Sequence, residues 1–462
     1  MIIAGTVLSL VLSGTPLAQS TQASGSAQSV SCTDWRNCRQ QALEAATRGD
    51  YEVFHDLAWR AVQAGPPRDP DLMYQLARAQ CLSGRPHDAL VMLRRLAELG
   101  VVTDASTHDD FRTTRELPGW ADVEALIERA RSAGGPPPAA PTPTPSPVNA
   151  AANESRATPA PGAAGAKSLS PAPAAVSRVK PAQVEETLRF SADRFEPGGF
   201  AHDVVSGRFL FGDVRGRKLM VVAEGGSYTV DMVRADSAGF HNVMAIEIDA
   251  RRGDLWVASA IKDGGAGAVH KLQLLSGRPL KTFAVPTELE PVKLTDLAVN
   301  GAGAVFVLES LRGQVLVLRP GGTSLEPFGR IDALGTVSLT AVGDENVIYV
   351  AHREGISRID SRNKVATPLT SRKGIELGRF ERLRWHRRTL VGIQSAEDGS
   401  RRVVSLELNA SGKGVTSATV IDAAVPDTAE ATFVALWGDS LSYLTVSNTS
   451  RPEFIVRRIP LQ

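Results

Sequence analysis

The chain has 462 residues, of which 22% are charged and 5% are aromatic, and its formal net charge is +1 at pH 7. This length predicts two to three domains. A near-neutral charge excludes a global basic field for nucleic acid or an acidic membrane, and sparse aromatics disfavour base-stacking platforms, so no nucleic-acid partner is expected.

The chain begins with an apolar run at residues 2–17, which glycines and Pro16 interrupt. The run is too short and too broken for a stable membrane span. Small polar residues follow it, and the pattern predicts a signal peptide over residues 1–23, cleaved after Ala18 or Ala23. No Lys or Arg precedes the run, which a start codon placed too far downstream would explain; the alternative is an uncleaved anchor. Abundant Ala, Gly and Pro, with more Arg than Lys, are typical of GC-rich bacterial genomes. Together with the predicted signal peptide, this composition leads us to expect a periplasmic or secreted bacterial protein.

Three cysteines lie in the first part of the chain. Cys32 and Cys38 are close in sequence, and in an oxidising compartment they can form a disulfide that closes a short loop around Trp35. Cys81 falls on an apolar helical face and is interpreted as a small buried thiol. The spacing matches no metal or redox motif.

Residues 31–132 are predicted to form an all-α domain, because apolar residues recur at three- and four-residue spacing. In residues 71–100 two such faces are separated by a turn at Gly84 and Pro86. This pair resembles a tetratricopeptide repeat, and a weaker copy lies about 35 residues upstream. Residues 107–120 lead into a final helix that would cap the stack. The resemblance implies that the repeats bind a protein partner along a concave face.

Residues 133–182 are dominated by Pro, Ala, Ser, Gly and Thr. Such a segment cannot bury a core and is predicted to be a disordered Pro/Ala-rich linker. It could reach on the order of 150 Å at about 3.1 Å per residue. We therefore expect two domains that are tethered but not docked.

Residues 183–462 are predicted to form an all-β domain. A short apolar strand recurs six times at intervals of about 40 to 50 residues, the repeat length of propeller blades. The strand at residues 186–191 has no blade of its own. Pairing with residues 453–459 would close the ring and remove an exposed edge. The six recurring strands begin at Arg208, Asp254, Ala304, Val347, Leu390 and Leu441.

Residues 195–219 carry Pro197, a Gly pair, a Gly turn and a following apolar strand. This segment resembles the opening of six-bladed propellers of the senescence-marker-30/gluconolactonase type, and residues 244–258 and 294–310 continue the likeness. The resemblance implies metal-dependent opening of lactones. In such enzymes a cation in the pore polarises the carbonyl and lowers the pKa of a bound water. The implied cation is calcium, magnesium, manganese or zinc.

The chain departs from this family pattern where the metal ligands should be. Gly198 replaces the carboxylate of Pro-Glu-Gly, and Thr295 replaces an Asn, although Asp296 remains. Residues 338–340 of the next blade offer no amide or acid. The remaining catalytic candidates are Asp296 and His241. The candidate metal ligands are Asn242, Asp296, Glu309 and, after a one-residue slip, Glu196. Ordinary strand-edge residues facing pore water are the alternative interpretation.

Several arginines crowd one blade, and they are either a solvated blade edge or a surface for an acidic or sugar-phosphate partner. The candidate partner-binding residues are Arg382, Arg384, Arg387 and Arg388. The leading hypothesis is an exported two-module scaffold whose propeller is a non-catalytic binding surface. The alternatives are a divergent metal-dependent lactonase or esterase, and a sensor that binds a small molecule in the propeller pore without turnover. No nucleophile elbow, HExxH motif, Walker loop or dinucleotide fingerprint is present.

Overall fold

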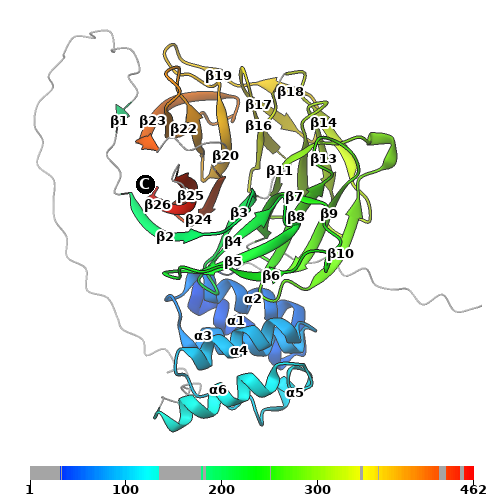
Figure 1. Cartoon of the computed structure of the whole chain (residues 1–462), viewed down its shortest axis with the longest axis vertical. Coiled ribbons are helices and arrows are strands. Elements are labelled where there is room, and N and C mark those ends of the chain that lie inside the picture. Colours follow the sequence, from blue (N-terminus) through cyan, green and yellow to red (C-terminus); the bar gives the residue numbers. More distant parts are fainter. Residues whose placement is uncertain are drawn as a thin grey trace, which may run out of the picture.

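The computed structural model describes residues 32, 34–134, 178–179, 184–249, 251–333, 335–343, 347–362, 364–425, 433–447 and 452–461. Within them, a helical region precedes a six-bladed β-propeller, as predicted (Figure 1). The predicted signal peptide and most of the predicted linker lie outside the described residues. No helix in the described part of the chain is long and apolar enough to cross a membrane.

The helical region is built from hairpins whose ends the sequence specifies. Asp34 caps the first helix by accepting hydrogen bonds from the backbone N of Arg36 and Asn37, at 2.8 and 3.1 Å. Gly84 has a φ of 78° and turns the chain between the third and fourth helices. The elements are α1 (Trp35–Thr47), α2 (Tyr51–Ala64), α3 (Pro70–Leu82), α4 (Pro86–Glu98), η1 (Asp109–Phe111), α5 (Arg112–Arg115) and α6 (Trp120–Ser132).

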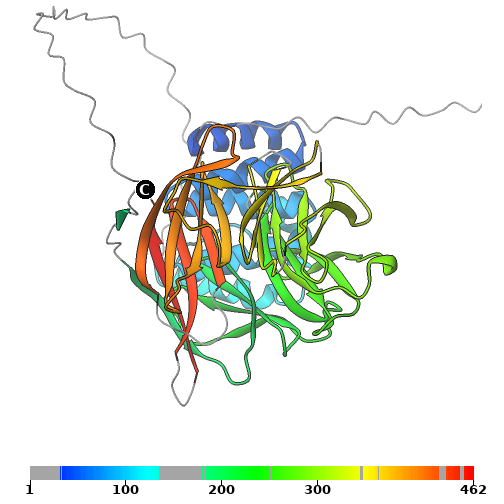
Figure 2. The same ribbon diagram turned by 90° about the horizontal axis from the view of Figure 1, so that it is seen from above.

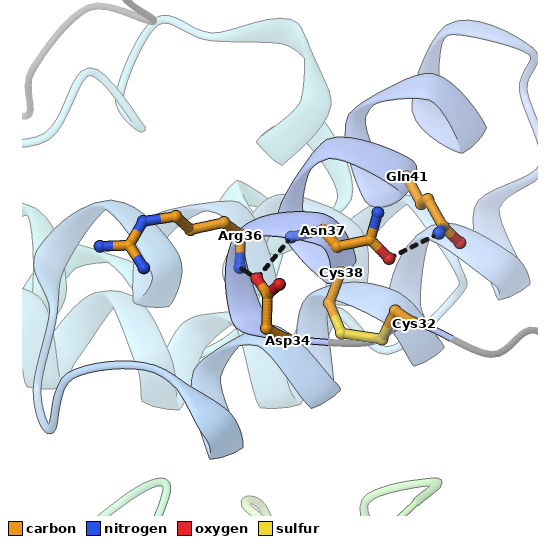
Figure 3. Close-up of a disulfide and its surroundings, with 6 residues drawn as sticks. All are labelled: Cys32, Asp34, Arg36, Asn37, Cys38 and Gln41. Carbon is orange, nitrogen blue, oxygen red and sulfur yellow. Dashed lines mark hydrogen bonds between the residues drawn. A yellow bond between two sulfur atoms is a disulfide. The ribbon is translucent and has the colours of Figure 1, made fainter. Parts of the chain in front are cut away.

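A disulfide joins Cys32 to Cys38 and ties the chain before α1 to the first turn of that helix (Figure 3). The two Cα atoms are 5.1 Å apart. Cys81 is a free, buried cysteine, and its Sγ lies 3.1 Å from the Thr113 hydroxyl.

Each blade of the propeller contains four antiparallel strands that lie side by side in order from the central pore outward; in one blade two short strands add to the outer strand in parallel. Blade 1 contains β3 (Pro197–Asp203), β4 (Arg208–Asp213), β5 (Lys218–Ala223) and β6 (Val230–Val233). Blade 2 contains β7 (Asn242–Asp249), β8 (Asp254–Ala260), β9 (Gly267–Gln273) and β10 (Pro279–Ala284). Blade 3 contains β11 (Leu294–Val299), β12 (Val305–Glu309), β13 (Gln314–Leu318) and β14 (Glu326–Arg330), with η2 (Thr287–Leu289) before it.

The remaining blades follow the same order. Blade 4 contains β15 (Ser338–Ala341), β16 (Val347–His352), β17 (Gly355–Asp360) and β18 (Ala366–Pro368). Blade 5 contains β20 (Phe380–His386), β21 (Thr389–Ser395), β22 (Arg401–Leu408) and β23 (Gly414–Val425), and β1 (Arg178–Val179) and β19 (Thr370–Ser371) pair with β23. Blade 6 contains β24 (Phe433–Trp437), β25 (Ser440–Ser447), β26 (Glu453–Pro460) and β2 (Glu185–Ser191).

The ring is closed by β2, which pairs antiparallel with β26 from Glu185 opposite Arg458 to Ser191 opposite Glu453. The predicted closure is therefore confirmed. Phe190 of β2 stacks on Phe454 of β26 at 5.3 Å and contacts Phe211 of blade 1 at 4.9 Å. Aromatic contacts of this kind add to the area that the closing strand buries.

The helical region is docked against blades 1 and 2, so the expectation of a tether without docking is wrong (Figures 1 and 2). Trp59 on α2 is 1% exposed, and its ring packs against Gly253 of the propeller. A Cβ added at Gly253 would lie 3.3 Å from this ring. Ser276 N donates to the Asp88 carboxylate of α4 at 3.0 Å. Linker composition indicated reach and flexibility, but it carried no information on the matching surfaces of the two domains.

Candidate functional site

The innermost strands β3, β7, β11, β15, β20 and β24 surround the pore and all run in the same direction along it. The end where these strands begin is called the open face. The helical region contacts turns at the opposite end, such as those at Gly253 and Ser276. The open face is therefore left uncovered by these contacts.

Asp296 lies at the centre of a charged cluster inside the pore. Its side chain is almost fully buried, and Oδ2 accepts hydrogen bonds from Ser338 Oγ at 2.5 Å and Leu339 N at 3.1 Å. The same oxygen is 3.3 Å from Nη1 of Arg384. Asp296 thus joins the inner strands of three successive blades, which explains why an acid is tolerated on a strand that is otherwise apolar.

Arg384 also faces Glu247 of β7, at 3.7 Å between Nη2 and Oε2. The Arg384 side chain is 9% exposed. Burial raises the pKa of Glu247 to about 7; Arg384 opposes this shift and the charge of Asp296 adds to it. The cluster therefore holds one guanidinium against one buried carboxylate and a second carboxyl group that takes up a proton near neutral pH.

The residues of the pore do not fit the cation that the family resemblance implies. A Cβ on Gly198 would lie 1.8 Å from the Val243 carbonyl oxygen, so no carboxylate can occupy that position without movement of the backbone. Asp296, the acid that remains, already contacts the Arg384 guanidinium. Within the described residues, no group of three or more His, Cys, Asp or Glu side chains is arranged to hold a metal ion.

His241 precedes β7 and Asn242 begins it. The Asn242 amide is satisfied by backbone groups: Nδ2 donates to Val214 O at 2.9 Å, and Oδ1 accepts from Lys262 N at 2.8 Å. The backbone N of His241 donates to Ser259 Oγ at 3.3 Å. Asn242 therefore fastens two loops of neighbouring blades to each other.

Glu309 and Glu196 also have partners away from Asp296. Glu309 is buried at the end of β12, and its carboxylate accepts from the backbone N of Lys293, Leu311 and Arg312 at 2.8 to 3.1 Å. Glu196 forms an ion pair with Lys262 at 2.7 Å. The structure thus does not bring the proposed ligand set together.

The arginine cluster divides into two separate sites. Arg384 and Arg382 lie on β20, whereas Arg387 and Arg388 lie on the turn at its far end. Arg387 forms an ion pair with Asp439 at 2.6 Å, and Arg388 is exposed. Arg387 and Arg388 therefore lie just beyond the end of the strand that carries Arg382 and Arg384.

Arg382 lines a cavity of 520 Å³ that lies between blades 4 and 5 at the open face. Sequence analysis missed most of this site because its walls come from three separate loops and strand ends. The signal that the sequence did offer for this cavity is a set of arginines that begin or follow strands in blades 4 and 5. The lining residues are Gly335, Val337, His352, Arg353, Arg379, Phe380, Glu381, Arg382, Ser395 and Arg401.

No protein-family model and no curated protein matches the chain. Solved structures are similar to part of the chain. A calcium-binding regucalcin from Agrobacterium tumefaciens str. C58 is 12% identical with a TM-score of 0.41, over 62% of this chain and 98% of that one. The PQQ-bound aldose sugar dehydrogenase from Streptomyces coelicolor is 10% identical with a TM-score of 0.41, over 62% and 100%. A virginiamycin B lyase from Staphylococcus aureus is 11% identical with a TM-score of 0.40, over 61% and 99%. At such low identity we draw no conclusion about activity.

Proposed function

We propose that this chain is an exported bacterial two-module binding protein, with a non-catalytic propeller and a helical region that takes a protein partner. The observation that carries this proposal is the position of Arg384. Its guanidinium lies between Asp296 and Glu247, the two carboxyl groups of the pore cluster.

A hydrolase of the gluconolactonase type needs a cation held by several oxygen ligands in the pore. In this chain the positive charge beside the pore carboxylate is the Arg384 guanidinium, which lies 3.3 Å from Asp296. A metal ion at the same carboxylates would be repelled by a guanidinium in a poorly solvated site. The pore cluster is accordingly explained as a structural link between blades.

The disulfide between Cys32 and Cys38 supports the proposed export. Structural disulfides persist in oxidising compartments such as the periplasm and are rare in the cytosol. This bond lies just after the predicted signal peptide, so it would form soon after translocation.

The proposed partner binding rests on the arrangement of the helices. Helices α1 and α2 pack as one pair and α3 and α4 as another, as tetratricopeptide repeats do. Trp59 on α2 and Asp88 on α4 face the propeller. We therefore propose α1, α3 and α6 as the partner surface.

The test is thermal unfolding of the full chain after chelation, with calcium, magnesium, manganese and zinc restored one at a time. We expect no saturable rise in the midpoint with any ion, and no hydrolysis of a lactone and ester panel. Asp296→Asn should leave both results unchanged.

A native-state cation would instead stabilise the chain by about 2.7 kcal/mol at a hundred times its dissociation constant. A saturable rise, together with lactone hydrolysis that Asp296→Asn abolishes, would replace our proposal by the hydrolase.

A further inference from the structure

The cavity beside the pore is strongly basic. Its lining contains four arginines and one glutamate within 520 Å³, a volume in the range of small-molecule sites. Val337 adds apolar surface to this lining, and Phe380 is buried behind it. A cavity of this kind fits a small organic molecule that carries negative charge.

Two of the four arginines are already neutralised by the protein. Nε of Arg401 lies 2.9 and 3.0 Å from the two carboxylate oxygens of Glu381. Arg379 contacts Glu397 at 3.2 Å and Glu376 at 3.6 Å. These pairs hold the wall of the cavity in place and leave little charge for a ligand.

The other two arginines, Arg382 and Arg353, have no carboxylate partner among the described residues. The Arg382 guanidinium lies 4.4 Å from the centre of the Phe433 ring, and its Nη1 donates to the backbone oxygen of Glu381 at 2.9 Å. Arg353 is exposed at the rim. Burial lowers the pKa of the Arg382 guanidinium, and the charges of Asp296 and Glu381 oppose this shift without forming an ion pair with it. An anion that enters the cavity would supply the missing counter-charge.

His352 is a buried polar residue in the wall of this cavity. Its side chain lines the cavity and the residue is only 6% exposed. Nε2 lies 3.0 Å from Ser357 Oγ, whereas Nδ1 has no hydrogen-bond partner among the described residues. Burial lowers the pKa of His352, so the ring is neutral at pH 7.

We propose that this cavity binds a small organic dianion, whose carboxylate or phosphate oxygens contact Arg353 and Arg382. Two uncommitted guanidiniums match two negative charges, and their planar donor groups suit the oxygens of either acid. The carbon skeleton would lie against Val337. This inference concerns a ligand, and it holds whether or not the helical region has a protein partner.

The experiment is calorimetric titration of the full chain, at constant ionic strength, with succinate, glycerol 3-phosphate and the monoanion acetate. We expect saturable binding of at least one dianion that is about tenfold or more tighter than that of acetate. Whether succinate or glycerol 3-phosphate binds distinguishes a dicarboxylate site from a phosphate site.

The matched variants are Arg382→Met and Arg353→Met, each of which should weaken dianion binding about tenfold or more. Methionine keeps a long apolar side chain and removes the charge. The control is Arg372→Met, the same change at an exposed position of the chain outside the cavity lining, which should bind as the unmodified chain does.

Three outcomes would overturn the proposal: no saturable binding of either dianion, acetate binding as tightly as the dianions, or equal losses in the control and in the cavity variants. Should Arg382→Met unfold, the exposed Arg353→Met still gives the answer.

Discussion

Arg384 and Arg382 lie two positions apart on one inner strand, and their surroundings differ. Arg384 contacts carboxyl groups from two other blades, at 3.3 and 3.7 Å. Arg382 rests on an aromatic ring and meets no carboxylate of the described residues. The comparison teaches that the role of a buried arginine is decided by what neighbouring blades place opposite it. One of these side chains completes the pore, and the other remains available to a ligand.

The largest expected effect tests this comparison directly. Arg384→Met should destabilise the chain by about 3 to 5 kcal/mol, because the buried Asp296 carboxylate then has no positive charge to pair with. Arg382→Met should cost about 1 kcal/mol, the loss of one cation–π contact. Urea unfolding of both variants gives the two values. Equal costs would show that the two arginines do not differ in role.

The double variant Asp296→Asn with Arg384→Met sharpens the same point. Removing both charges together avoids an uncompensated ion, so the double variant should be more stable than Arg384→Met alone. A double variant that loses the sum of the two single costs would mean that the pair is not coupled.

A smaller effect is expected from the pH dependence that Glu247 confers. Its pKa rises from an ordinary 4.5 to about 7 on folding, so between these values the folded chain binds a proton that the unfolded chain has released. This contribution is complete below pH 4.5 and is lost as the pH rises through 7, a change of about 3 kcal/mol at most. Glu247→Gln should remove this slope in urea unfolding between pH 5 and 8. Glu288→Gln, at an exposed position, should retain it.

The smallest effect concerns a buried carboxyl group outside the propeller pore. Burial against the propeller raises the pKa of Asp88 to about 6, and the group accepts a hydrogen bond from Ser276 N. Asp88→Ala should weaken docking by about 1 to 2 kcal/mol, because that donor loses its partner. Faster hydrogen exchange in α4 and in the turn at Ser276 would report it. Asp88→Asn keeps an oxygen acceptor and should preserve protection; equal exchange in both variants would contradict this role.

Sequence periodicity predicted the architecture well, because each blade repeats a short apolar strand and each helix repeats an apolar face. The closing strand followed from counting strands against blades. The site was harder, because Glu247, Asp296 and Arg384 meet only after three blades pack around the pore. Arg384 was grouped with Arg387 and Arg388 by sequence proximity, and Glu247 was not selected at all. For Asp296 a useful signal is that it is the one charged residue of its inner strand.

The closing strand also sets the order in which the ring can be completed during synthesis. Thr187 on β2 donates to Val456 on β26, a residue 269 positions later in the chain. The ribosome therefore delivers the first propeller strand long before its partner exists, and the ring stays open until the final strand emerges. An unpaired strand edge invites pairing with other chains. Shortened products that end before β26 would expose two such edges at once, so early termination should produce aggregates.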